Sequence, residues 1–251
     1  NTGQTVTSSV SHFSVRTTDY VIPGMIFDLT LTLYNDAGFH QVHTIKLPIG
    51  NPSIDDPFGP DAYGYWCYDS GDIAYEDAPE YDWIEIATTA GGDGVNTNLT
   101  SDFNNNQSTT TMDLPFTFRF YGVDYDVVSI CGNGWISFGV TEQATQRNWR
   151  LPGTLGPCPM ISAFWDNLSL GAGGVYTMYD EINSKFIIQW HNARNVIGNA
   201  QETFQIILYN PEFYHTATAD GPFKIQYKVF NNLNNGANTP TGIGNWGNYA
   251  T

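Results

Sequence analysis

The feature that most constrains the fold is an alternation of apolar and polar residues with a period of two, which recurs along most of the chain. In the stretch FDLTLTLY, Phe27, Leu29, Leu31 and Leu33 fall on one side of an extended segment. Successive side chains of a β-strand point to opposite faces, so this pattern predicts a strand with one buried face. No long stretch has the 3.6-residue spacing of an amphipathic helix. The sequence therefore predicts an all-β protein.

The alternating stretches also fall into pairs separated by turn residues. FDLTLTLY and HTIKLPIG flank the turn NDAG, and YDVVSI and WISFG flank CGNG, in which Asn133-Gly134 is a strong hairpin signal. GVYTMY pairs in the same way with KFIIQWHN, and ETFQIILYN with FKIQYKVF. In LPFTFRFYG, Phe116, Phe118 and Phe120 share a face that should line a core. We expect immunoglobulin-like strands followed by an antiparallel, jelly-roll-like β-sandwich.

These patterns divide the chain into three regions. Residues 1–50 contain too few strands to close a sandwich, so we expect a partial immunoglobulin-like domain. Residues 51–108 combine the turn-rich GNPSIDDPFGP, an acidic aromatic segment and the polar tract NTNLTSDFNNNQSTT, which together predict a linker and a loop. Residues 109–251 hold the long run of paired strands and should form the β-sandwich.

The charge balance limits the kinds of partner. The chain has 25 Asp and Glu against 9 Lys and Arg, a net charge of -16. A field of this sign repels nucleic acid phosphates and anionic membrane surfaces. No apolar stretch reaches the roughly 20 residues that a membrane-spanning helix needs. We therefore expect neither nucleic acid binding nor membrane insertion, and the lysine-poor composition resembles that of secreted or cell-surface bacterial proteins.

Residues 59–83, GPDAYGYWCYDSGDIAYEDAPEYDW, crowd acids and large aromatics together without one Lys or Arg. Calcium binds several carboxylate and carbonyl oxygens, often in an irregular loop with glycine at its corners. Asp61, Asp69 and Asp72 fit that chemistry, although the spacing is not that of an EF-hand. The alternative is a solvated acidic surface. Calcium is thus the one cofactor that the sequence suggests.

The aromatic residues of the same segment allow a second interpretation. Tyr65, Trp66, Tyr68 and Trp83 could form a flat platform for a carbohydrate, since exposed rings beside acids are a common way to hold a sugar. The alternative is packing in a core or at a domain junction.

Catalytic constellations are not recognisable in the sequence. GWISFG has the wrong spacing for the Gly-x-Ser-x-Gly nucleophile elbow and belongs to a hairpin. None of Cys67, Cys131 and Cys158 stands in the local sequence of a known nucleophile that could act with His191 or His215. We expect no catalytic residue. A disulfide between Cys131 and Cys158 is open to an exported chain, and small buried thiols are the alternative.

Several longer stretches resemble a recurring module of exported bacterial proteins, from about residue 45 to the end of the chain. They are DPFGPDAYGYWCYDSGD, APEYDWIEI, DLPFTFRFYGVDYDVVSICGNGWISFG, ISAFWDNLSLGAGGVYTMYD, KFIIQWHNA and ETFQIILYN. The module occurs beside gingipain-like cysteine peptidases, subtilisin-like serine peptidases and large surface proteins of bacteria that use type IX secretion. The resemblance implies a non-catalytic β-sandwich after an immunoglobulin-like domain whose last strands resemble GFHQVHTIKLPIG. It also implies one more strand after NYAT, so the sandwich is expected to lack its final strand.

These observations favour a non-catalytic accessory module of a larger secreted or surface protein, acting as a spacer, an adhesion unit or a domain-docking unit. Its expected partners are the other domains of that protein and a glycan or another cell-surface ligand. The alternative function is that of a carbohydrate-binding module of a polysaccharide-degrading enzyme.

Overall fold

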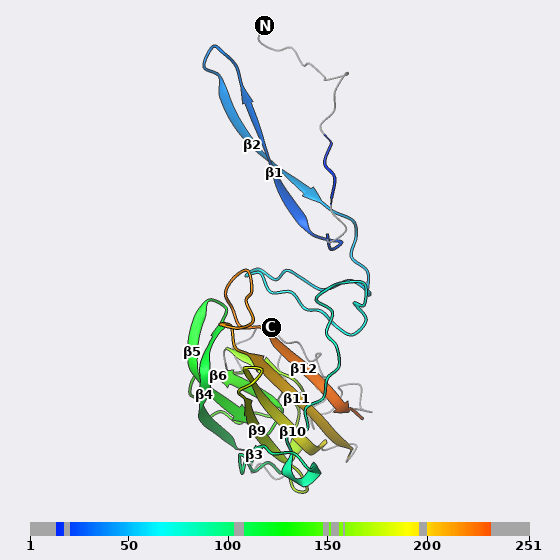
Figure 1. Ribbon diagram of the computed structural model, residues 1–251, viewed down its shortest axis with the longest axis vertical. Coiled ribbons are helices and arrows are strands. Elements are labelled where there is room, and N and C mark those ends of the chain that lie inside the picture. The colour runs from blue at the N-terminus through cyan, green and yellow to red at the C-terminus, as the bar shows by residue number, and fades with distance from the viewer. Residues whose placement is uncertain are drawn as a thin grey trace. The chain divides into compact units, whose positions relative to one another are not determined.

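The computed structural model describes residues 14–17, 21–102, 108–147, 151, 156–157, 159–195 and 200–231 (Figure 1). The chain forms two compact units, Asn1–Glu80 and Tyr81–Thr251. The boundary falls inside the stretch 51–108, so each unit takes a part of that stretch. Twelve strands and one short 3-10 helix make up the described regular structure, and the predicted all-β class is confirmed.

The regular part of the first unit is a hairpin of β1 (Ile26–Tyr34) and β2 (His40–Pro48). The strands pair antiparallel with Leu29 opposite Ile45, so the predicted hairpin and its phase are confirmed. The side chain of Asn35 closes the turn, because its Oδ1 accepts the backbone N–H groups of Ala37 and Phe39, each at 3.0 Å. The apolar face is more open than the alternation predicts: the exposed fractions of Phe27 and Ile45 are 37% and 48%.

The second unit contains a four-stranded antiparallel sheet in which the strands follow one another in chain order. β-branched and aromatic residues, which favour extended conformations, dominate its long strands. The sheet consists of β4 (Thr109–Phe120), β5 (Val123–Cys131), β6 (Trp135–Phe138) and β7 (Met160–Ser162).

A six-stranded sheet lies opposite, with β12, β11, β10, β9 and β3 as successive neighbours and β8 paired with β10 (Figure 1). Four of its strands again follow chain order, so each sheet is a meander. A 3-10 helix, η1 (Thr88–Ala90), precedes β3. The strands are β3 (Val95–Asn96), β8 (Leu168–Ser169), β9 (Gly174–Asp180), β10 (Lys185–Asn195), β11 (Gln201–Tyr209) and β12 (Phe223–Val229).

The two sheets enclose an aromatic core, as the strand phases predict. Phe118 and Phe120 are 0% and 1% exposed. Phe164 meets Phe204 of β11 edge to face, with ring centres 5.9 Å apart. The indole N–H of Trp190 on β10 donates to the carbonyl of Cys131 on β5 at 3.0 Å. The predicted β-sandwich is confirmed.

The predicted turn at Asn133-Gly134 joins β5 to β6, but it is an interior turn. Gly134 has a φ of +84°, which favours glycine, and a Cβ there would lie 1.9 Å from the carbonyl oxygen of Phe164. Asn133 is fully buried: its Oδ1 accepts the N–H of Leu168 at 3.1 Å, and its Nδ2 donates to the carbonyl of Ala144 at 3.0 Å. The turn is thereby fixed to β8 and to the connection between β6 and β7.

Candidate functional site

Asp69 and Asp72, two of the three predicted calcium ligands, share a turn of the first unit. Asp61 organises a separate turn. The Oδ1 atom of Asp61 accepts the backbone N–H groups of Tyr63, Gly64 and Tyr65 at 2.9, 2.7 and 2.9 Å. In the other turn, the Oδ2 atom of Asp72 accepts the N–H of Asp69 at 2.6 Å. These carboxylates therefore act as acceptors for the backbone of an irregular segment.

Nothing in the geometry of these acids resembles a metal centre. Across the described residues, no group of three or more His, Cys, Asp and Glu side chains is placed to hold a metal ion. Calcium binding by Asp61, Asp69 and Asp72 therefore stays a prediction from the sequence.

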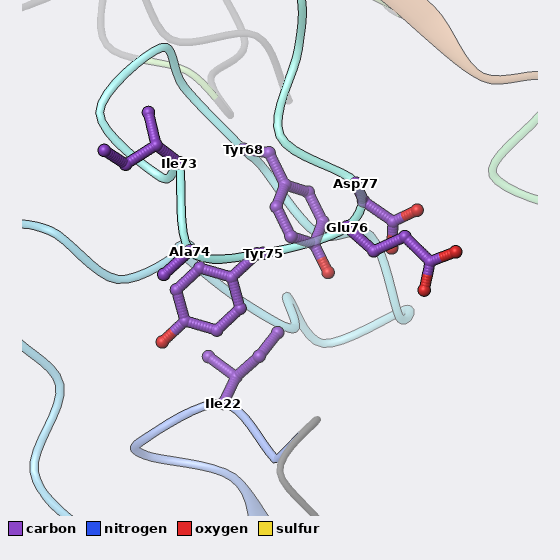
Figure 2. A pocket seen from close by; sticks show the side chains of 7 residues that line it. All are labelled: Ile22, Tyr68, Ile73, Ala74, Tyr75, Glu76 and Asp77. Carbon is purple, nitrogen blue, oxygen red and sulfur yellow. The ribbon is translucent and has the colours of Figure 1, made fainter.

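A cavity of about 630 Å³ lies in the same unit (Figure 2). Tyr75 donates a short hydrogen bond from its hydroxyl to Asp56, and this bond raises the pKa of Tyr75 to about 12. Burial, followed by Asp77, raises the pKa of Tyr68. The cavity thus presents phenol groups that stay protonated at neutral pH beside carboxylates. Its lining is Ile22, Tyr68, Ile73, Ala74, Tyr75, Glu76 and Asp77.

The four aromatic residues proposed as a sugar platform are divided between the units. Tyr65, Trp66 and Tyr68 belong to the first unit and are half-buried, whereas Trp83 belongs to the second. Within the second unit, the ring of Trp83 stacks at 6.5 Å on that of Tyr81, which is 62% exposed. Carbohydrate binding at this platform also stays a prediction.

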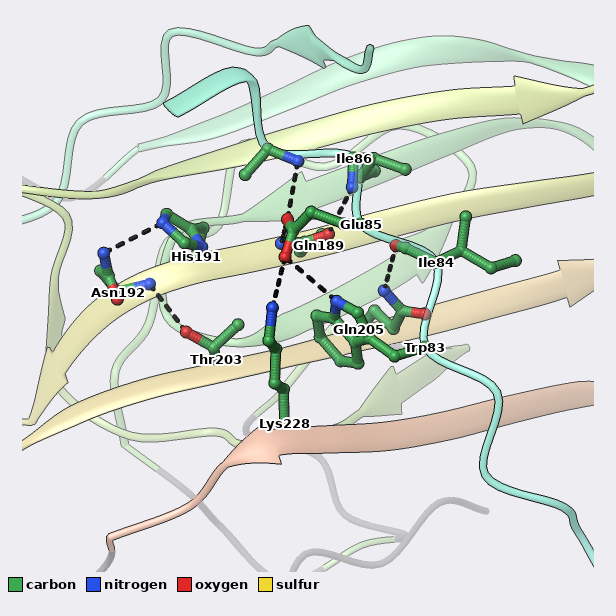
Figure 3. Close-up of polar contacts among 11 residues, drawn as sticks. Trp83, Ile84, Glu85, Ile86, Gln189, His191, Asn192, Thr203, Gln205 and Lys228 are labelled. Carbon is green, nitrogen blue, oxygen red and sulfur yellow. Dashed lines mark hydrogen bonds and ion pairs between the residues drawn. The ribbon is translucent and has the colours of Figure 1, made fainter. Parts of the chain in front are cut away.

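An extended polar network of the second unit surrounds residues 81–87, which we call the strap. The strap is extended and crosses the outer face of the six-stranded sheet (Figure 3). Ile86 and Ala87 are fully buried against Tyr176, Ile187 and Ile207 of that face. Strap residues thus complete a second hydrophobic cluster, outside the sandwich core.

Three buried glutamines from neighbouring strands bind the strap backbone. Gln226 of β12 exchanges two hydrogen bonds of 2.8 Å with the backbone of Asp82. Gln205 of β11 donates to the carbonyl of Ile84 at 3.0 Å, and Gln189 of β10 accepts the N–H of Ile86 at 3.0 Å (Figure 3). The three side chains lie directly across from one another in the sheet, and Gln226 also donates to Gln205 at 2.9 Å. We call this row the glutamine ladder.

Glu85 closes the network on the solvent side of the strap. Its carboxylate accepts hydrogen bonds from Lys228 and Gln189 at 2.7 Å, from the N–H of Ala87 at 3.1 Å and from the indole of Trp83 at 3.2 Å. Burial raises the pKa of Glu85, but these hydrogen bonds outweigh burial and lower the pKa to about 2. A carboxylate with four donors favours its ionised form, so Glu85 holds strap and sheet together at neutral pH.

Among the described residues, neither Cys67 nor Cys131 forms a hydrogen bond with His191, the candidate base. His191 lies beside the strap and is half-buried, with its Nε2 3.0 Å from the Nδ2 atom of Asn192. Burial is the main cause that lowers its pKa. Cys131 is a buried free thiol whose pKa burial raises to about 11, and Cys67 is exposed. Cys158, the other half of the suggested disulfide, lies outside the described residues.

Two further acids of the second unit are Asp166, which precedes β8 and is half-buried, and Glu202, which lies on the core-facing side of β11. Asp166 accepts a hydrogen bond of 2.7 Å from the side chain of Asn195, and Glu202 is 0% exposed. Sequence analysis singled out neither carboxylate. The available signal was Glu202 itself, because an acid at the core phase of the alternating stretch ETFQIILYN interrupts the apolar face.

The glutamine ladder also left a trace in the sequence. FIIQWHN, TFQIILY and FKIQYKV each carry one glutamine opposite to the core phase, where exposed strands more often carry charged or small polar residues. That trace becomes informative only once the register shows the three glutamines to be neighbours.

The comparison with known protein families matches the part of the chain that forms the second unit. A model of the family described as NIDO related matches residues 80–243 and so begins at the strap. Searches of curated proteins and of solved structures gave no significant match. Among the described residues, no helix has the length and apolarity needed to cross a membrane. With about two thirds of its length matched, the chain belongs to the NIDO-related family.

Proposed function

We propose that the chain is a non-catalytic, extracellular-type accessory module that acts as a spacer between parts of a larger protein. Membership of the NIDO-related family suggests a module of this type. The resemblance to modules found beside gingipain-like peptidases suggests that the larger protein is a secreted or surface protein of a bacterium that uses type IX secretion. The observation that carries the spacer role is the attachment of the strap.

The strap is the point at which the chain passes from the first unit into the second. Force applied to the first unit enters the second through Tyr81, and the glutamine ladder spreads it over β10, β11 and β12. Each buried hydrogen bond must break before the strap leaves the sheet, and an orphaned buried partner costs about 1–3 kcal/mol. Such an attachment suits a unit that transmits tension.

Force spectroscopy on the full chain, held at its two ends, tests this role. Gln205→Ala should lower the force at which the second unit opens, because the carbonyl of Ile84 and the amide of Gln226 lose a partner. Gln201→Ala, at an exposed site on the same strand, is the matched control and should leave that force unchanged. Equal opening forces for the three proteins would contradict a mechanical role of the strap.

The same proposal assigns no reaction to the chain. Hydrolysis of peptides or polysaccharides by the purified protein, abolished by a single substitution at Asp166 or His191, would contradict it.

Carbohydrate binding is the second candidate, and the exposed ring of Tyr81 beside Trp83 favours it. A glycan array with the full chain tests this function. Binding that Tyr81→Ala removes would support it, and an array without any bound glycan would reject it. Tyr121→Ala is a control at an aromatic residue elsewhere in the unit.

A further inference from the structure

The cavity of the first unit combines a buried apolar part with an acidic rim. Its volume is about 630 Å³, and it is lined by Ile22 and by residues between Tyr68 and Asp77. Ile22 is 6% exposed, whereas Glu76 and Asp77 are exposed. Figure 2 shows both carboxylates pointing to the same side, next to the ring of Tyr68. A ligand that enters the cavity therefore meets carboxylates at the rim and apolar surface inside.

The hydrogen-bond donors of the lining side chains are already used. The hydroxyl of Tyr75 donates to Asp56, and that of Tyr68 donates to Asp77. The other polar side-chain atoms of the lining belong to the carboxylates of Glu76 and Asp77, and an ionised carboxylate only accepts hydrogen bonds. A sugar hydroxyl would find acceptors on these side chains but no free donor. The lining side chains therefore suit a ligand that carries N–H donors and no acceptor.

In the part of the chain that the structure describes, no basic side chain balances the charge of this rim. Neither Glu76 nor Asp77 forms an ion pair with a lysine, arginine or histidine, and no basic residue occurs in the sequence between Lys46 and Arg119. The faces of tyrosine rings also attract cations within about 6 Å. The acids and the rings of the cavity thus favour the same class of ligand, an organic cation.

We propose that this cavity binds a lysine or arginine side chain of a partner protein. Both side chains carry N–H donors and no acceptor, and both have a methylene stem that packs on apolar surface. The stem lies against Ile22 and the two tyrosine rings, and the charged group lies against the carboxylates of Glu76 and Asp77.

An organic cation fits the cavity better than a metal ion does. A hard metal ion takes its ligands from several oxygens and gains nothing from rings and aliphatic side chains. Across the described residues, no three side chains of His, Cys, Asp and Glu are grouped to hold such an ion. The cavity belongs to the first unit, so this proposal does not depend on the spacer role of the strap.

The test is an NMR titration of the full chain, in chelator, with the N-acetyl methylamides of lysine, arginine and norleucine. Norleucine reproduces the stem of lysine without its charge. The lysine and arginine probes should bind with dissociation constants of about 1 mM, the affinity expected of exposed ion pairs and an exposed cation–π contact. The norleucine probe should bind at least about tenfold more weakly, because it keeps only the apolar contacts.

Substitutions of the rim separate local contacts from the overall charge. Glu76→Gln and Asp77→Asn should each weaken binding of both cationic probes by about two- to fivefold. Asp55→Asn removes the same charge at an exposed acid of the first unit that does not line the cavity, and it is the matched control with unchanged affinity. Equal weakening by all three substitutions would show that only the field of the unit attracts the probes, and would overturn the proposal.

Two substitutions of Tyr68 test the contribution of its ring. Tyr68→Phe keeps the ring and frees Asp77 from its phenol partner, so this variant should bind the cationic probes at least as tightly as the unmodified chain. Tyr68→Leu removes the ring and should bind them about two- to fivefold more weakly. Unchanged resonances of the β1–β2 hairpin show that each variant is folded. Equal affinities of the two folded variants, or equal affinities of the three probes, would contradict the proposed site.

Discussion

Gly221 shows how closely single residues fit in the sandwich. A Cβ at this position would lie 2.2 Å from the ring of Phe118, which is fully buried and stacks on Phe138 with ring centres 5.0 Å apart. The ring cannot move aside without disturbing that stack. The backbone N–H of Gly221 also donates to the carbonyl of Arg119 at 2.7 Å, so the loop is held close to β4.

We therefore expect Gly221→Ala to destabilise the second unit by about 1–3 kcal/mol, the usual range for overpacking a core. Gly171→Ala is the matched control. Gly171 is exposed, and the nearest atom to a Cβ there is the Oγ of Ser169 at 3.7 Å. Urea denaturation of the two variants measures the difference, and equal midpoints would show that the loop can retreat from Phe118.

The sequence predicts the burial of a residue correctly where the alternation along its strand is the only influence on that burial. Phe118 and Phe120 are buried because β4 keeps the strict alternation that the sequence shows. Phe116 has the same phase but is only partly buried, since it lies nearer the middle of a strand whose pairing with β5 is interrupted between Asp113 and Phe118. Alternation gives the face of a residue, and the sheet geometry sets how deeply that face is covered.

The strap is the element whose stability should depend most on pH. The pKa of Glu85 is lowered to about 2, below the ordinary value of about 4.3 for a glutamate in an unfolded chain. A group with a lowered pKa stabilises the folded state above its unfolded pKa, and that stabilisation is lost as the pH falls toward its folded pKa. The contribution of Glu85 should therefore be complete at pH 5 and decline between about pH 4.5 and 2.

Glu85→Gln isolates this contribution. Because Glu85 is partly solvated and its interactions are screened, we expect the variant to be less stable by about 1–2 kcal/mol at pH 6 and to approach the unmodified chain near pH 2. Unfolding free energies measured across this pH range provide the check. A constant difference between the two proteins over the range would show that the charge of Glu85 does not hold the strap.

At the scale of the whole molecule, the chain consists of two units with unequal internal order. In its described residues the first unit has one two-stranded hairpin, and hairpins of this kind are marginally stable by themselves. The second has two sheets and a buried aromatic core. Unfolding of the full chain should therefore not follow a single two-state transition.

We expect a fragment of residues 81–251 to fold and to keep the melting temperature of the second unit in the full chain. A fragment of residues 88–251 lacks the strap, so Ile86 no longer covers its cluster and the glutamine ladder loses its partners. Its melting temperature should be lower by at least about 5 °C. Calorimetry of both fragments measures this, and identical curves would place the strap outside the cooperative unit.

The sequence by itself determined the all-β class, the paired strands and the face that each strand buries, because a period of two and the turn residues between strands are local properties. The position of Asn133-Gly134 in a hairpin followed for the same reason. The tertiary structure alone decided which strands far apart in the chain become neighbours. Residues 81–87 lie about a hundred positions before β10, yet they complete its outer face. Asp166 precedes β8 and Asn195 ends β10, 29 positions later, yet the two side chains share a hydrogen bond of 2.7 Å. Such sites depend on register and packing between distant segments, which a local pattern does not encode.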